Sequence, residues 1–205
     1  MTENTKIALS DKELELVCNT NWILTKHIII QKVYTLFGDV LPHLQNKLER
    51  EKSWLPTDVF ITQAKISKGE NYQLLPYVML DYPRYFSKED SFAIRTFFWW
   101  GNFFSVTLQL SGIHKNDYLP RLMNHFNYLQ QNNFWVCVND DLWEHHFDES
   151  NYMPIQNFTE ENFWAIVSRE PFVKIAKKIP LQQWQEAEVF ITTTFDELIK
   201  LLKTG

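Results

Sequence analysis

Glycine is scarce in this chain, and its scarcity excludes several classes of nucleotide-binding protein. The sequence contains 5 glycines in 205 residues. It has neither the G-x-G-x-x-G pattern of dinucleotide-binding loops nor the G-x-x-x-x-G-K-[ST] pattern of phosphate-binding loops. Both loops need glycine where the backbone approaches a phosphate, so neither can form here. Collagen-like and glycine-rich disordered chains are excluded for the same reason.

The chain also lacks an excess of basic charge. Its 20 Lys and Arg residues stand against 25 Asp and Glu residues, which gives a formal net charge of −5. Nucleic-acid binding draws most of its affinity from neutralised phosphates. The densest basic run contains only Lys174, Lys177 and Lys178, and such a run is typical of a solvated edge. We therefore expect no nucleic-acid partner.

Cysteines and long apolar runs are few as well. Cys18 and Cys137 form no C-x-x-C pair, which excludes a local redox pair or zinc knuckle, and we expect both to be buried free thiols. No window approaches 18 uncharged apolar residues, and the first residues lack the apolar segment of a signal peptide. These features predict a cytoplasmic protein with no membrane partner.

Aromatic residues, in contrast, are abundant. The chain has 16 Phe, 8 Trp and 8 Tyr, and hydrophobic residues make up 45% of it, enough for a large core. Apolar residues follow helical spacing near both termini and β-type spacing between them, which is typical of an α+β fold. We expect residues 1–9 to be a flexible tail and residues 10–205 to form a single α+β domain.

The N-terminal segment carries clear helix signals. Ser10 and Glu13 form a capping box, in which each side chain satisfies a free backbone N–H of the first turn. A second helical pattern covers residues 21–37. Gly38-Asp39 predicts a break, after which a third helix runs to about Lys52.

The C-terminal half contains further helical patterns, over residues 117–131, 159–168 and most of 181–203. A run of three threonines at 192–194 argues against one continuous last helix, because β-branched residues have lower helix propensity. Thr194 and Glu197 form a second capping box that would restart the helix.

The central part of the chain predicts an antiparallel meander around residues 58–110, within a sheet of four or more strands. Gly101-Asn102 favours a two-residue hairpin loop, because glycine takes the positive φ that such a loop requires. Shorter strands are expected at 134–138 and 172–176. The four β-type runs of the meander cover residues 59–67, 74–82, 91–100 and 103–110.

A two-residue loop would set Arg95 opposite Leu108, on an otherwise apolar sheet face. A guanidinium cannot lose its proton at ordinary pH, so burial demands a partner or a ligand. Asp81 and Glu89 are the nearest candidate partners in the sequence. Two interpretations stay open: a structural ion pair between Arg95 and Asp81, or a site that holds a small carboxylate or phosphate ligand.

The anion-binding interpretation draws on the neighbouring residues. Pro83 predicts that the second strand ends in a rigid corner, which would place polar and aromatic side chains at the rim of a pocket. The candidate ligand-binding residues are Arg95, Asp81, Tyr82, Arg84 and Trp99.

The other predicted face of this hairpin is too apolar for open water. It must be covered by the protein's own helices, by another subunit or by a ligand. The residues that make it apolar are Phe92, Ile94, Phe98, Trp100 and Phe103.

Residues 139–149 combine acidic side chains with two histidines. If residues 140–148 form a helix, four of these side chains share one face. Such a face is either solvated or a weak candidate for a divalent metal, although no other segment indicates further ligands. The four residues are Asp141, Glu144, His145 and Asp148.

No catalytic signature emerges, and whether the protein is an enzyme stays open. The function that these features favour is a non-catalytic binding or assembly protein, in which the aromatic sheet surface supports a homo-oligomer. One alternative is an enzyme or anion-binding protein anchored by Arg95. The other is a metal-dependent hydrolase that uses the segment 141–148, with no other cofactor expected.

Overall fold

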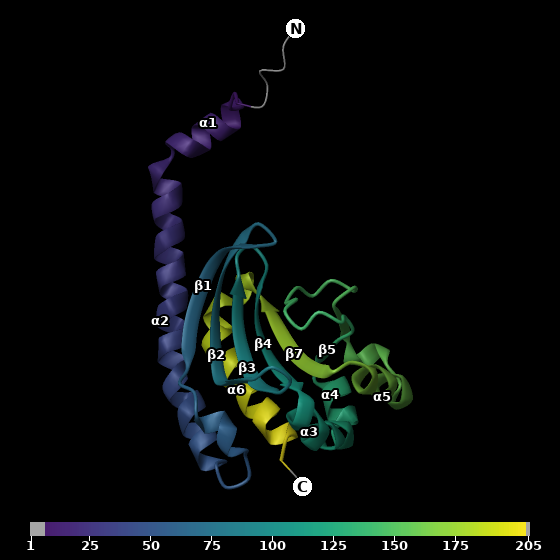
Figure 1. The fold of residues 1–205 in the computed structure, drawn as a ribbon. Coiled ribbons are helices and arrows are strands. Elements are labelled where there is room, and N and C mark those ends of the chain that lie inside the picture. The colour runs from purple at the N-terminus through teal and green to yellow at the C-terminus, as the bar shows by residue number, and fades with distance from the viewer. Residues whose placement is uncertain (1–6, 204–205) are drawn as a thin grey trace.

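A seven-stranded antiparallel sheet forms the centre of the molecule (Figure 1). The computed structural model describes residues 7–203. The first four strands are neighbours in the sheet, so the predicted α+β class and the meander are confirmed. The strands, in the spatial order β1-β2-β3-β4-β7-β5-β6, are β1 (Lys65–Tyr72), β2 (Leu75–Phe86), β3 (Ser91–Trp99), β4 (Phe103–Ser111), β7 (Phe172–Pro180), β5 (Trp135–Cys137) and β6 (Tyr152–Pro154).

Helices from both ends of the chain cover one face of this sheet (Figure 1). Side chains of that sheet face, among them Val78, Phe98 and Val106, belong to one large core with those of α2 and α6. The helices are α1 (Asp11–Cys18), α2 (Thr20–Arg50), α3 (Gly112–Asn124), α4 (Phe126–Gln131), α5 (Glu160–Arg169) and α6 (Ala187–Leu201), with short 3-10 helices at η1 (Thr57–Phe60), η2 (Ile155–Asn157) and η3 (Leu181–Glu186).

Helix α2 passes through the predicted break without interruption, so the expectation of a separate third helix is wrong. Its buried stripe, Ile30, Val33, Phe37, Val40, Leu44 and Leu48, continues on both sides of Gly38. A glycine inside a helix costs about 1 kcal/mol relative to alanine, whereas each large apolar side chain contributes about 1.5–3 kcal/mol on burial. Burial of the stripe therefore outweighs the local helix-breaking signal.

The last helix is also continuous through its threonines. Helix α6 runs across residues 192–194, and Thr194 is buried within it rather than acting as a cap. The Thr192 hydroxyl donates to the Glu188 carbonyl at 3.0 Å, which satisfies the polar group inside the helix. The predicted restart at Thr194 is wrong, because Ile191 and Phe195 must both face the core.

The β3–β4 hairpin differs from the prediction by one residue. Trp99 faces Phe103, so the loop has three residues, 100–102, rather than two. This shift transfers every β4 side chain to the opposite face, and Arg95 lies opposite Thr107 instead of Leu108. The observed register places Phe104, Val106, Leu108 and Leu110 in the core under the helices, and this burial selects it.

Strand β2 does not end at Pro83, so the predicted corner is wrong. The strand continues to Phe86, with an irregular register between Asp81 and Arg84. Proline has no N–H to contribute to the strand ladder and is tolerated at such a bulge.

Residues 138–151, which we call the covering segment, join β5 to β6. They form turns and irregular backbone, so the helix predicted over 140–148 is not formed. Asn139 accepts a hydrogen bond from the Asp141 N–H at 2.7 Å, and Asp141 accepts one from the Trp143 N–H at 2.8 Å. Such local side-chain bonds compete with helix formation.

Residues 7–28 form an arm made of α1 and the first part of α2, which extends beyond the sheet (Figure 1). The capping box predicted at Ser10 and Glu13 is present at the start of α1. Of the predicted tail, residues 1–6 lie outside the described residues. Among residues 7–203, no helix is both long and apolar enough to cross a bilayer.

Candidate functional site

Arg95 and Asp81 form a buried ion pair on the sheet face away from α2 and α6. The two residues are directly opposed on β3 and β2. Arg95 Nε lies 2.7 Å from Asp81 Oδ1, and Arg95 Nη2 lies 2.9 Å from Asp81 Oδ2. This is a two-bond pairing, the strongest geometry for a guanidinium and a carboxylate. Of the two interpretations that the sequence leaves open, the ion pair between Arg95 and Asp81 is present in the structure, and both carboxylate oxygens are used in it.

His145, from the covering segment, makes the third contact to this guanidinium. Its Nε2 lies 2.8 Å from Arg95 Nη1. Burial holds the pKa of His145 well below its ordinary value, and the charges of Arg95, Lys174 and His146 act in the same direction. The imidazole is neutral, so Nε2 accepts a hydrogen bond from Arg95.

Lys174 lies on β7 of the same sheet face and is fully buried. Its Nζ donates to the carbonyl oxygens of Leu142 at 3.1 Å and Glu144 at 2.6 Å, both in the covering segment. Burial lowers the pKa of this lysine. The interpretation of Lys174 as part of a solvated basic edge is therefore wrong. Its position in the middle of the predicted apolar strand 172–176 was the sequence feature that indicated burial.

Tyr72, at the end of β1, fixes the covering segment on the same sheet face. Its hydroxyl donates to Glu144 Oε2 at 2.8 Å. The hydroxyl oxygen of Tyr72 also accepts hydrogen bonds from the backbone N–H groups of His145 at 2.6 Å and His146 at 2.9 Å. Burial is the main reason that the pKa of Tyr72 is raised. Tyr72 and Lys174 thus hold the backbone of residues 142–146 over the Arg95–Asp81 pair.

The structure does not gather the remaining candidates for anion binding around Arg95. Tyr82 packs against the core under the helices, on the other face of β2. Arg84 lies at the bulge, and its Nε is buried without a hydrogen-bond partner among residues 7–203. Trp99 shares the face of Arg95, but its ring packs in an aromatic cluster and its indole N–H donates to the Tyr72 carbonyl at 3.2 Å.

The four candidate metal ligands are likewise dispersed. Glu144 is engaged by Tyr72, and His145 by Arg95. Within residues 7–203, no three His, Cys, Asp or Glu side chains lie close enough together to hold a metal ion. Without the expected helix, no common face unites Asp141, Glu144, His145 and Asp148.

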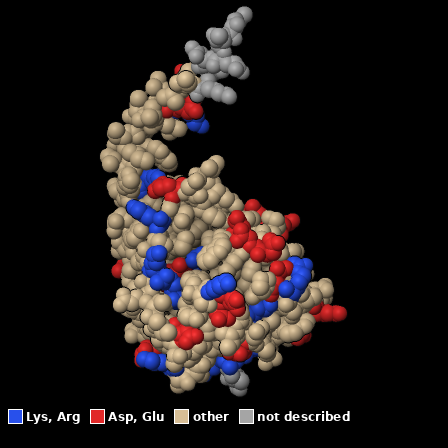
Figure 2. All heavy atoms as spheres, viewed as in Figure 1, with Lys and Arg blue, Asp and Glu red and all other residues tan. Residues whose placement is uncertain are grey.

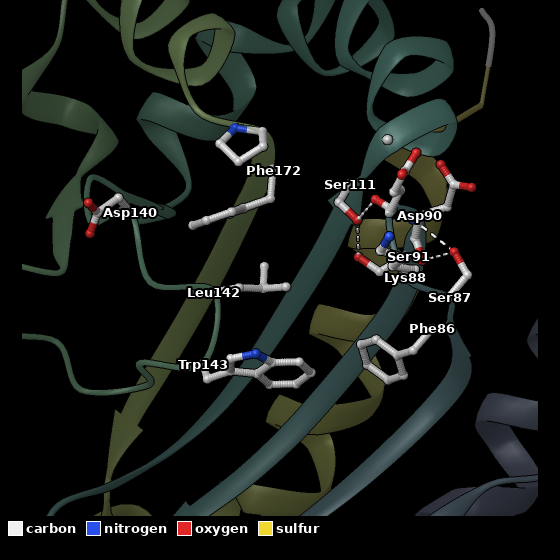
Figure 3. A pocket seen from close by; sticks show the side chains of 13 residues that line it. Phe86, Ser87, Lys88, Asp90, Ser91, Ser111, Asp140, Leu142, Trp143 and Phe172 are labelled. Carbon is white, nitrogen blue, oxygen red and sulfur yellow. Dashed lines mark hydrogen bonds between the residues drawn. The ribbon is translucent and has the colours of Figure 1, made fainter.

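A cavity of about 590 Å³ opens beside this polar network (Figure 3). It lies where β3 begins and β4 ends, and Ser91 and Ser111 line it from these strand ends. Leu142 and Trp143 of the covering segment also line it. The Trp143 ring centroid lies 5.8 Å from Arg95 Cζ, so this indole is adjacent both to the cavity and to the buried ion pair.

The arm is a second candidate surface, which the sequence analysis did not single out. It exposes Leu14, Val17 and Leu24, and Cys18, which we expected to be buried, is exposed with them. Cys137, in contrast, is buried as expected. Helical spacing alone did not distinguish an apolar face that packs internally from one that stays open.

An apolar hollow of about 300 Å³ adjoins the base of the arm. Its lining includes Trp100, Leu181 and Trp184. The arm residue Trp22 packs edge-to-face on Trp100, with ring centroids 6.2 Å apart. The arm and the hollow therefore form one continuous apolar surface.

Comparison with protein-family models, with curated proteins and with solved structures finds no match to this chain.

Proposed function

We propose that this protein is a non-catalytic assembly protein that associates with a second copy of itself through the arm. The observation that carries the proposal is the concentration of exposed apolar side chains there. Of the 16 large hydrophobic residues that are exposed among the described residues, nine lie between residues 7 and 28. Exposed apolar surface that is contiguous in this way marks protein–protein interaction sites.

The length of α1 supports the need for a partner. This helix has 8 residues, none of them buried within the described structure. Isolated helices shorter than about 12–15 residues are marginal in water, and most helical stability in proteins comes from packing. A surface that covers Leu14 and Val17 would supply this packing.

The charges of the arm favour a protein partner over a lipid or nucleic-acid surface. Residues 16–25 contain no charged side chain, and Figure 2 shows uncharged surface along this part of the arm. The flanking helix α1 carries Asp11, Glu13 and Glu15 against the single Lys12. Anionic lipids and phosphates would be repelled by this acidic end, whereas an apolar protein surface would not.

A second copy of the chain fits this surface because the surface is self-complementary. A projecting apolar arm and an apolar hollow lie next to each other at Trp22 and Trp100. In a two-fold dimer, the arm of each subunit can enter the hollow of the other, which makes the two contacts identical.

The test is the mass of the protein in solution, measured by light scattering during gel filtration. We expect a dimer at concentrations up to about 100 μM, a range that detects micromolar dissociation constants. The double variant Val17→Asp/Leu24→Asp places charges on the exposed apolar surface of the arm and should be a monomer with an unchanged circular dichroism spectrum.

The matched control is Leu74→Asp/Val189→Asp, because both of these exposed residues lie outside the arm. This control should remain a dimer. A wild-type protein that is monomeric throughout this concentration range, or a control that dissociates as readily as the arm variant, would contradict the proposal.

Other functions have less support. The aromatic sheet surface expected to drive assembly is internal, since every residue of β3 and β4 is buried. An anion at Arg95 would compete with Asp81, whose two oxygens already bond the guanidinium. A metal-dependent hydrolase lacks a ligand cluster within residues 7–203. We also propose a cytoplasmic location, which the free thiols Cys18 and Cys137 support.

A further inference from the structure

The cavity beside Trp143 has the size and the construction of a ligand-binding site. Its volume of about 590 Å³ lies within the range of about 300–1,000 Å³ that is usual for small-molecule sites. Its walls come from four separate parts of the chain: the turn between β2 and β3, the junction of β4 and α3, the covering segment, and the residues that begin β7. This site is independent of the arm.

One side of the cavity is apolar and aromatic. Leu142, Trp143 and Phe172 lie on this side, and Phe86 faces Trp143 (Figure 3). The ring centroids of Phe86 and Trp143 are 5.9 Å apart, with their planes inclined by 40°. These side chains offer flat surfaces to the apolar part of a ligand.

Trp143 is open to the cavity although its position is fixed. Trp143 is 54% exposed, whereas the other aromatic residue of this part of the covering segment, Phe147, is 8% exposed. The backbone N–H of Trp143 donates to Asp141 Oδ1 at 2.8 Å, and the indole lies over the Arg95 guanidinium. An indole held with one side open to a cavity is suited to stack on a ligand rather than to fill the core.

The opposite side of the cavity presents hydrogen-bond acceptors. The Ser111 hydroxyl lies 3.0 Å from the Glu89 carbonyl oxygen and 2.9 Å from Ser91 Oγ. The Ser111 hydroxyl has one proton, so it donates to one of these two oxygens, and Ser91 Oγ keeps at least one lone pair free. The Ser87 hydroxyl donates to the Asp90 carbonyl at 3.2 Å. The protons of Ser87 and Ser111 are used inside the protein, and Ser91 Oγ is left with a lone pair that can accept a hydrogen bond from a ligand.

The charged side chains around the cavity also favour a ligand that donates hydrogen bonds. Its lining includes three carboxylates, Glu89, Asp90 and Asp140, against the single ammonium of Lys88. Asp90 and the serines lie together across from Trp143, whereas Asp140 lies farther out on the side of Leu142 (Figure 3). A ligand that donates hydrogen bonds and carries positive charge satisfies both the free lone pairs and the excess of negative charge.

We infer that this cavity binds a small organic ammonium ion with a flat apolar body. The ammonium group lies at the serine side, near Ser91, Ser111 and the carboxylates of the β2–β3 turn. The apolar body lies against Trp143 and Phe172. This assignment differs from the carboxylate or phosphate ligand predicted from Arg95, because the cavity itself is acidic and Arg95 is not among the residues that line it.

The test compares three probes that share a phenyl ring and differ in their charge: 2-phenylethylammonium, 2-phenylethanol and 3-phenylpropanoate. Binding is followed by two-dimensional NMR of the ¹⁵N-labelled protein. We expect the ammonium probe to shift the signals of Ser91, Ser111 and the Trp143 indole. The neutral probe should bind at least about ten-fold more weakly, a difference of about 1.4 kcal/mol, and the carboxylate probe should leave these signals unchanged.

Variants locate the site. Trp143→Ala and Glu89→Gln should each weaken binding of 2-phenylethylammonium by about ten-fold or more. Trp164→Ala and Glu161→Gln are the matched controls, because both residues are exposed on α5, away from the cavity lining. Asp90 is left intact, because its Oδ1 accepts the Ile113 N–H at 2.8 Å at the start of α3.

Three results would contradict the proposed ligand or its site. Failure of the ammonium probe to bind at millimolar concentration would overturn the inference. Equal binding of all three probes, or preference for 3-phenylpropanoate, would also overturn it, since charge would then play no part or the opposite one. A loss of affinity in Trp164→Ala equal to that in Trp143→Ala would place the binding elsewhere.

Discussion

At the scale of single residues, the sheet face away from α2 and α6 contains buried charged groups that all have hydrogen-bond partners. Arg95 and Asp81 neutralise each other, and neutral His145 occupies a further N–H of the guanidinium. Lys174 has two carbonyl acceptors instead of a carboxylate. Buried groups of this kind contribute little net stability while intact, but the loss of one partner leaves the other uncompensated.

The first prediction concerns the ion pair. Asp81→Asn should lower the free energy of unfolding by about 3–5 kcal/mol, because the buried guanidinium loses its counter-charge. The double variant Asp81→Leu/Arg95→Met should recover most of this loss, since it removes both charges together. Urea unfolding measures both.

The control for this prediction is an exposed ion pair. Arg169→Met breaks the contact between Arg169 and Glu170 on the surface, where a pair contributes about 0–1 kcal/mol. If Asp81→Asn proves no more destabilising than Arg169→Met, the Arg95–Asp81 pair is not the structural element described here.

The second prediction concerns pH. The pKa of His145 is lower in the folded protein than in the unfolded chain, because burial and nearby cations oppose its protonation. Below about pH 6.5 the unfolded chain binds a proton at this histidine that the folded protein does not bind. Stability should therefore fall as the pH drops below about 6.5, by up to about 1.4 kcal/mol per pH unit for this one group.

Urea unfolding between pH 5 and pH 8 measures this dependence. His114 acts in the same direction, because its burial also lowers its pKa. His145→Gln should therefore reduce the slope without abolishing it. The same substitution at exposed His27 is the control and should leave the slope unchanged. A slope that is identical in wild type and His145→Gln would be inconsistent with a neutral buried imidazole.

At the scale of elements, the covering segment depends on side chains of the sheet to hold its backbone. It forms turns rather than a helix or a strand across the sheet face away from α2 and α6. Its position is maintained by Tyr72 from β1 and Lys174 from β7, which bond the backbone of residues 142–146. The same residues set the position of Trp143 at the cavity.

The third prediction tests this attachment. Tyr72→Phe removes the acceptor of two backbone N–H groups, and each buried donor left without a partner costs about 1–3 kcal/mol. Hydrogen exchange should become faster at residues 144–147, while the amides of α2 and α6 keep their protection. Tyr128→Phe, which removes a hydroxyl that bonds Glu197 at the surface, is the control. Equal acceleration in all elements would indicate that Tyr72 stabilises the whole fold rather than this segment.

At the scale of the whole molecule, the arm is separated from the core that folds around the sheet. Helix α2 joins the two, since its buried stripe begins at Ile30 and its exposed apolar residues lie before that point. Association through the arm would add stability to the folded protein in proportion to its concentration, because a partner that binds only the folded state shifts the unfolding equilibrium.

The fourth prediction follows from this linkage. The midpoint of thermal unfolding of the wild-type protein should rise as the protein concentration rises from about 1 to 100 μM, a range that spans micromolar dissociation constants. The midpoint of Val17→Asp/Leu24→Asp should not depend on concentration. Circular dichroism at matched concentrations measures both, and a wild-type midpoint that is constant over this range would argue against a dimer.

Much of the local structure was predictable from residues near one another in the chain. The α+β class, the meander and the capping box at Ser10 all depend on short-range spacing. The Arg95–Asp81 pair was predictable because a buried guanidinium needs a nearby carboxylate. The contacts of His145, Lys174 and Tyr72 were not predictable, because they join residues about 30–70 positions apart through a segment without periodicity.

What the sequence determined by itself is therefore the set of elements and their approximate limits, since helix spacing, strand alternation and caps are local properties. The tertiary structure alone decided which local signals prevailed. Core burial carried α2 through Gly38 and set the three-residue hairpin loop, because several apolar side chains together outweigh one turn preference. It also decided that Lys174 is buried and Val17 exposed, since a side chain's exposure depends on what packs over it.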